Sequence, residues 1–93
     1  MGSIIQEEKE CFVCKTRQGL HKHHVFYGTA NREKSEQYGL TVWLCGRHHN
    51  MSDEGVHFNK ELDEKLKKHA QRKFESTHGN REAFRMIFGK SFI

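Results

Sequence analysis

The sequence predicts a small α+β domain stabilised by zinc, and three observations lead to this prediction. Two ligand pairs, Cys11-x-x-Cys14 and Cys45-x-x-His48, come from distant segments, and such pairs usually close a tetrahedral zinc site. Residues 40–44 are rich in β-branched and aromatic side chains and predict a strand, whereas the C-terminal third has helical periodicity. A chain of 93 residues buries only about 60–65% of its unfolded surface, so a stabilising metal is expected.

Two strands are expected in the N-terminal half. The first spans residues 22–27 and ends at Gly28. The second spans residues 40–44 and delivers Cys45 to the zinc site. Consecutive side chains of a regular strand point to opposite faces, so His23 and His24 can serve one site only if the first strand bends or ends there.

The helices are expected from their capping residues. Short helices are predicted over residues 31–38, followed by Gly39 as C-terminal cap, and over about residues 46–51. A long helix capped by Asn59 reaches about residue 78, and Asn80 caps the last helix. The residues expected in the core are Trp43, Leu62, Leu66, Ala70, Phe74, Thr77, Ala83, Phe84, Ile87 and Phe88.

The chain reads as one domain over residues 1–93. Residues 1–10 are a candidate flexible segment, residues 11–58 a zinc knuckle with the strands, and residues 59–93 the C-terminal helices. Three cysteines cannot all pair, and no apolar stretch resembles a signal peptide or a membrane span, so a cytoplasmic location is expected. The net charge of +4 favours a polyanionic partner. No heptad pattern supports an oligomer, which favours a monomer.

Two strands and a helix around a histidine-rich centre form the ββα-metal arrangement. The motifs His23-His24-Val25 and Cys45-Gly46-Arg47-His48-His49 resemble those of the HNH (His-Me finger) endonucleases. In that family the first strand holds a metal ligand followed by the general-base histidine, and the second leads into Cys-x-x-Cys-His. His23 stands where many members have Asp. The resemblance implies a DNA endonuclease.

A narrower resemblance covers roughly residues 11–90. Residues 23–32, 55–57 and 70–75 look like those of small phage-encoded proteins grouped with the recombination-enhancing, RecA-dependent (Ref-like) nucleases. This resemblance implies a role in DNA recombination inside the phage's host cell, with activity on DNA coated by a recombinase filament.

One position departs from the family pattern. The asparagine that gives the family its middle letter is replaced by Gly39-Leu40. Asn31, Asn50 or a backbone carbonyl are the candidates to orient His24 instead.

Phosphodiester hydrolysis needs a base for water and a cation for the charge on phosphate. We expect His24 to be the general base and His23, His49 and His57 to hold a catalytic divalent ion. Mg, Mn, Ni and Zn are the candidate ions, and an all-histidine shell suits Zn, Ni, Mn or Co better than Mg. His48 is expected to complete the structural zinc site, with His49 or His21 as substitutes.

Phosphate contacts are expected from Arg47, Arg72 and Lys73. Arg72 and Lys73 have no acidic residue four positions before them, whereas Lys65, Lys67 and Lys68 follow acidic residues by four positions and are expected on a solvated helix face. Arg47 is also a candidate catalytic contact to the transition state. The further basic residues that extend this patch are Lys15, Arg17 and Lys22. His21, His69 and His78 are expected at the surface. The alternative function is a non-catalytic zinc-knuckle DNA-binding module or a phage accessory interaction protein.

Overall fold

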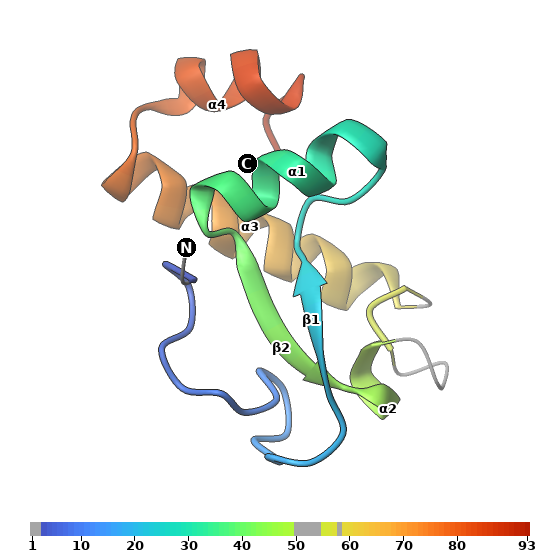
Figure 1. The fold of residues 1–93 in the computed structure, drawn as a ribbon. Coiled ribbons are helices and arrows are strands. Elements are labelled where there is room, and N and C mark those ends of the chain that lie inside the picture. The colour runs from blue at the N-terminus through green and yellow to red at the C-terminus, as the bar shows by residue number, and fades with distance from the viewer. Residues whose placement is uncertain (1–2, 50–54, 58) are drawn as a thin grey trace.

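A computed structural model describes residues 3–49, 55–57 and 59–93. Over these residues the chain forms a two-stranded antiparallel sheet and helices, which confirms the α+β class (Figure 1). The elements, in chain order, are β1 (Leu20–His24), α1 (Thr29–Tyr38), β2 (Thr41–Cys45), α2 (Gly46–His49), α3 (Lys60–Thr77) and α4 (Arg81–Phe88). No helix within the described ranges has both the length and the apolar character needed to cross a membrane.

The first strand lies two residues earlier than expected. In the β1–β2 ladder Leu20 pairs with Cys45 and His24 pairs with Thr41. The chain then leaves the ladder because Phe26 enters the core, where the Ser35 hydroxyl accepts from its N–H at 3.1 Å and donates to its carbonyl at 2.6 Å. The predicted strand over residues 22–27 was therefore wrong in its C-terminal half.

The first helix also begins earlier than its predicted cap. Gly28 is the N-cap of α1, with a φ of 97° that favours glycine, and Asn31 lies inside the first turn. The prediction of an Asn31 cap was wrong. Gly39 ends the helix in the left-handed conformation, as expected. The short helix expected over about residues 46–51 is observed as α2 over Gly46–His49, and residues 50 and 51 lie outside the described ranges.

Both C-terminal helices begin where their asparagines predicted. The Asn59 side chain accepts a hydrogen bond from the Leu62 N–H at 3.2 Å, and the Asn80 side chain accepts one from the Ala83 N–H at 2.9 Å. The apolar stripe of α3 differs at its end, because Thr77 is exposed. Gln71 is fully buried instead, and its side-chain oxygen accepts from the Phe92 N–H at 2.7 Å in the C-terminal segment.

The core is built largely from phenylalanine rings. Phe84 is fully buried, and its ring centre lies 5.2 Å from that of Phe26 and 4.7 Å from that of Phe88. Trp43, which was expected in the core, is only partly buried, and the Lys9 ammonium lies 4.7 Å from its ring centre. Aromatic packing between α4 and the rest of the chain therefore supplies much of the apolar burial.

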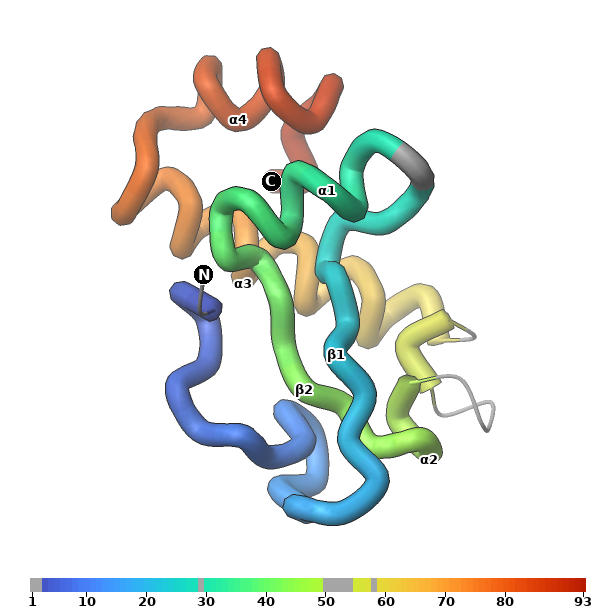
Figure 2. Tube along the Cα trace, in the orientation of Figure 1, coloured from blue at the N-terminus to red at the C-terminus, as the bar shows by residue number. Residues whose placement is uncertain are grey.

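Residues 1–10 were a candidate flexible segment, and the described residues 3–10 run alongside β2 (Figure 2). The Ile4 N–H donates to the Gly39 carbonyl at 2.9 Å, and the Trp43 N–H donates to the Gln6 side-chain oxygen at 2.8 Å. The second of these bonds satisfies one N–H on the outer edge of β2. The chain then reaches Cys11, whose N–H donates to the Thr16 carbonyl at 2.8 Å.

Phe84→Ala is expected to lower the free energy of unfolding by about 3–5 kcal/mol, because it removes a fully buried ring that contacts several others. Urea unfolding of zinc-loaded protein would measure this. Met86→Ala is the matched control on the same helix, since Met86 is 81% exposed and its loss should change stability by less than about 0.5 kcal/mol. Equal effects of the two substitutions would contradict this view of the core.

Candidate metal centres

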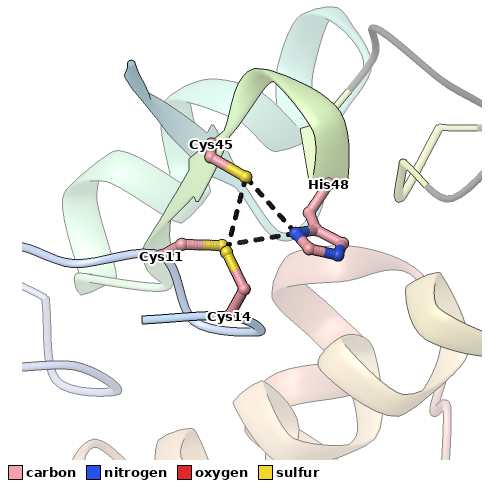
Figure 3. Close-up of side chains that lie close together, drawn as sticks. All are labelled: Cys11, Cys14, Cys45 and His48. Carbon is pink, nitrogen blue, oxygen red and sulfur yellow. Dashed lines mark hydrogen bonds between the residues drawn. The ribbon is translucent and has the colours of Figure 1, made fainter. Parts of the chain in front are cut away.

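Four predicted ligands come together near the end of β2, and we call them the cysteine–histidine cluster. Its members are Cys11, Cys14, Cys45 and His48, which can offer ligand atoms all within 4.8 Å of one another. Cys11 and Cys14 come from the N-terminal loop, Cys45 ends β2, and His48 lies on α2 with its Nδ1 toward the sulfurs (Figure 3). His48 fills the fourth place, and neither His21 nor His49 belongs to the cluster.

The spacing of the cluster fits a tetrahedral ion. The Sγ atoms of Cys14 and Cys45 are 3.7 Å apart, and Cys45 Sγ lies 3.3 Å from His48 Nδ1. Two sulfurs that each lie about 2.3 Å from one zinc ion at a tetrahedral angle would be about 3.8 Å apart. All three cysteines are free thiols. The cluster can therefore hold a metal such as zinc.

The two buried thiols differ in their ease of ionisation. Burial raises the pKa of Cys11, but backbone N–H groups of Cys14, Cys45 and Val13 outweigh it and lower this pKa to about 6. Burial raises the pKa of Cys45, and the neighbouring thiols raise it further. Three thiolates side by side repel one another, so a bound cation would favour ionisation of all three.

Three further histidines converge on one point, and we call them the three-histidine cluster. His23 from β1, His49 from α2 and His57 from the described residues 55–57 can place ring nitrogens within 4.8 Å of one another. The Nε2 atoms of His49 and His57 are 3.2 Å apart. Two nitrogens bound to one zinc ion at about 2.05 Å would be about 3.3 Å apart, so this spacing also fits an ion.

His23 gives the clearest sign that this cluster suits a metal. Its side chain is only 2% exposed, and its Nε2 is buried without a hydrogen-bond partner among the described residues. An unpaired buried nitrogen costs about 1–3 kcal/mol, and a metal ion would satisfy it. Burial, with His49 and His57 nearby, lowers the pKa of His23 to about 3, so the ring is neutral and able to bind an ion at pH 7.

His49 also contacts a histidine outside the cluster, and this contact was not predicted from the sequence. Its Nδ1 lies 2.9 Å from Nδ1 of His21, which was expected to be a surface residue but is half-buried. Burial, followed by His57 and His21, lowers the pKa of His49 to about 4. With Nδ1 engaged, the opposite ring nitrogen faces the cluster, as is usual for metal-binding histidines. The sequence signal for this contact was the two-residue spacing of His21 and His23, which places both side chains on the same face of a strand.

His24 points away from the three-histidine cluster. Its Nε2 lies 2.8 Å from Oε2 of Glu36 on α1, and Oε1 of the same carboxylate accepts from Lys22 Nζ at 2.7 Å. Alternation along β1 explains this division, because Lys22 and His24 share one strand face and His23 the other. Glu36 therefore occupies the place expected for Asn31, Asn50 or a backbone carbonyl. Asn50 lies outside the described residues.

Both strand faces nevertheless border one cleft of about 760 Å³. The chain leaves β1 at His24 and turns at Gly28, so the two histidines reach the same opening, as the sequence analysis required. The residues that line the cleft are Lys22, His23, His24, Tyr27, Gly28, Arg32, Glu33, Glu36, His49 and His57. The predicted base and the predicted metal ligands thus share one solvent-accessible space.

The wall of this cleft is supported from α3. Lys67 Nζ lies 4.6 Å from the ring centre of Tyr27 and 5.5 Å from that of Phe92. Asp63 Oδ2 accepts from the same ammonium at 2.8 Å. Lys67 is thus a largely covered cation packed on Tyr27, whereas the sequence predicted a position on a solvated helix face.

The predicted phosphate contacts lie elsewhere. Arg47 is exposed on α2, and Arg72 and Lys73 are exposed on α3. None of the three belongs to the cleft lining found within the described ranges, whose basic residues are Lys22 and Arg32. Comparisons with protein-family models, with curated proteins and with solved structures found no match to this chain.

Removing metal with a chelator is expected to unfold the domain, because a structural zinc ion contributes on the order of 10 kcal/mol at neutral pH. Far-UV circular dichroism, recorded while released zinc is measured, would follow this. Cys45→Ser should be largely unfolded from the start and gain little helix from added zinc. A chelated chain that retained its melting transition would contradict a structural ion in the cysteine–histidine cluster.

His21→Ala is expected to weaken metal binding by the three-histidine cluster by about 10–100-fold, because it removes the partner of a metal-binding ring. Cobalt titration of zinc-loaded protein, followed by visible absorption, would measure this affinity. His78→Ala is the control, since His78 is exposed and bonds the Tyr38 carbonyl. Equal cobalt affinity in the His21 variant and wild type would rule out an orienting role for His21.

Proposed function

We propose that this protein is a metal-dependent DNA endonuclease of the HNH type, with the two strands and α2 as its ββα-metal unit. The observation that carries the proposal is the convergence of the three-histidine cluster beside His24 in one open cleft. A purely structural ion needs a closed set of four ligands, whereas three ligands leave positions for water and substrate. The cysteine–histidine cluster is the structural site in this proposal.

His23, His49 and His57 would hold the catalytic divalent ion, and their three neutral donors suit Zn, Ni, Mn or Co. When bound, the ion supplies a positive charge that stabilises the phosphate and the leaving oxygen. The unpaired buried Nε2 of His23 supports this assignment.

His24 would take the proton from the attacking water. It lies on the same cleft as the ligands, its side chain is 17% exposed, and Glu36 holds one ring nitrogen. The second nitrogen remains for the reaction. General-base assistance of this kind is worth roughly 10²–10⁴-fold in rate.

Arg32 would bind a phosphate of the DNA backbone. It is exposed at the cleft in the first turn of α1, and Lys22 at the same cleft is already paired with Glu36. Arg47, Arg72 and Lys73, on exposed helix faces, would bind phosphates further along the strand. Such contacts position the backbone and give no sequence preference.

The need for a recombinase filament rests on the Ref-like resemblance of residues 23–32, 55–57 and 70–75. The proposal therefore includes DNA coated by a RecA-like recombinase as the preferred substrate, inside the cell that a phage infects. Weak cleavage of bare DNA and stronger cleavage of coated DNA are expected. Rapid cleavage of naked duplex would remove the recombinase from the proposal and leave the nuclease.

His24→Ala is expected to lower the cleavage rate by about 10²–10⁴-fold while zinc content and helical signal stay unchanged. The measurement is nicking of supercoiled plasmid and of circular single strands, bare and recombinase-coated, with Mg²⁺ or Mn²⁺. His69→Gln is the control, because His69 lies on α3 against Phe12, outside the cleft lining.

An absence of cleavage by zinc-loaded wild type on every substrate would contradict the endonuclease. Salt-dependent DNA binding in that case, weakening about 10-fold or more between 50 and 200 mM salt, would indicate the zinc-knuckle binding module. An absence of DNA binding as well would indicate an accessory interaction protein.

A further inference from the structure

Glu36 is bonded through both of its oxygens. Oε1 accepts from Lys22 Nζ at 2.7 Å, and Oε2 lies 2.8 Å from His24 Nε2. The hydrogen bonds from Lys22 and then His24 lower the pKa of Glu36 below its ordinary value. The group is therefore an ionised carboxylate at neutral pH.

An ionised carboxylate can only accept hydrogen bonds, so the hydrogen in its bond to His24 must lie on Nε2. A neutral imidazole has one N–H and one nitrogen with a lone pair. The lone pair of His24 is consequently on Nδ1. The contact to Glu36 thus selects both the orientation of the ring and the nitrogen that can accept a proton.

Lys22 makes this arrangement more rigid. Lys22 and His24 are two residues apart on β1 and project from the same strand face, so both reach one carboxylate on α1. Because Lys22 occupies Oε1, the carboxylate is held at both ends. Glu33, one turn earlier on α1, also lines the cleft, so the chain contains a second carboxylate suited to a control.

We propose that Glu36 is a positioning residue that holds His24 in the Nε2–H tautomer and leaves Nδ1 as the atom that takes a proton from water. This inference rests on the proposed endonuclease. In the step, a water O–H bond breaks and its proton goes to Nδ1 while the oxygen bonds to phosphorus. The bond from phosphorus to the leaving oxygen breaks with its electron pair on that oxygen. The leaving oxygen takes a proton from solvent, and His24 later releases its own.

The first test reads the tautomer directly and needs no activity. Long-range ¹H–¹⁵N correlation spectra of the zinc-loaded protein, with the His24 signals identified from a His24→Gln spectrum, should show a protonated Nε2 and an unprotonated Nδ1. Glu36→Leu should give a mixture of tautomers at His24. A protonated Nδ1 in the wild type, or an unchanged spectrum in the Glu36 variant, would overturn the proposal.

The second test uses kinetics with a matched pair of variants. Glu36→Leu and Glu33→Leu each remove one negative charge from the cleft, so both should lower KM for DNA to a similar extent. Only Glu36→Leu should lower kcat, by about 10–100-fold, by analogy with the loss of a carboxylate that orients a metal-binding histidine. Glu36 is 43% exposed, so the variant should fold, and its zinc content and melting temperature would verify this.

The outcomes separate this inference from the proposed function. If the wild type cuts DNA and kcat is the same in both variants, the positioning role is wrong and the endonuclease stands. If the wild type cuts no DNA but the tautomer changes in Glu36→Leu, the endonuclease is wrong and Glu36 still fixes the His24 ring. Loss of kcat together with the tautomer change supports both.

Discussion

The antiparallel pairing of β1 with β2 is the constraint on which the rest of the structure depends. It places Leu20 opposite Cys45, and α2 starts at the next residue, so His49 returns beside His23. The period of two along β1 then assigns His21 and His23 to one face and Lys22 and His24 to the other. A shift of one residue in this ladder would exchange the two faces and separate the metal ligands from one another.

Features that carry a sequence motif could be predicted, and contacts that arise from packing alone could not. Ligand pairs three positions apart and asparagine caps before α3 and α4 act within one turn, so the local sequence itself specifies them. Glu36 reaches His24 only because α1 packs against β1, and Gln71 is buried only because its side-chain oxygen accepts from the Phe92 N–H. Neither contact has a sequence signal, since both join residues that are 12 or more positions apart.

The buried rings show where the requirements of stability and of ion binding differ. Phe26 and Phe84 bury only apolar surface, which stabilises the fold wherever they stand. His23 is almost equally buried, yet its Nε2 has no partner among the described residues. An apolar side chain at this position would remove that unpaired nitrogen, and it would also remove a ligand. The polar residue is therefore explained better by ion binding than by folding.

His48 and His49 are neighbours on α2, and they belong to different clusters. The single helical turn of α2 therefore supplies a ligand to each centre. An ion that orders this turn by binding His48 also orders His49. An ion bound by the cysteine–histidine cluster would order α2 and therefore His49. The three-histidine cluster would then lose less conformational entropy when it binds its own ion. The two occupancies would then be linked, and by reciprocity the second ion would strengthen retention of the first. The affinity of each centre for its ion would therefore depend on whether the other centre is filled.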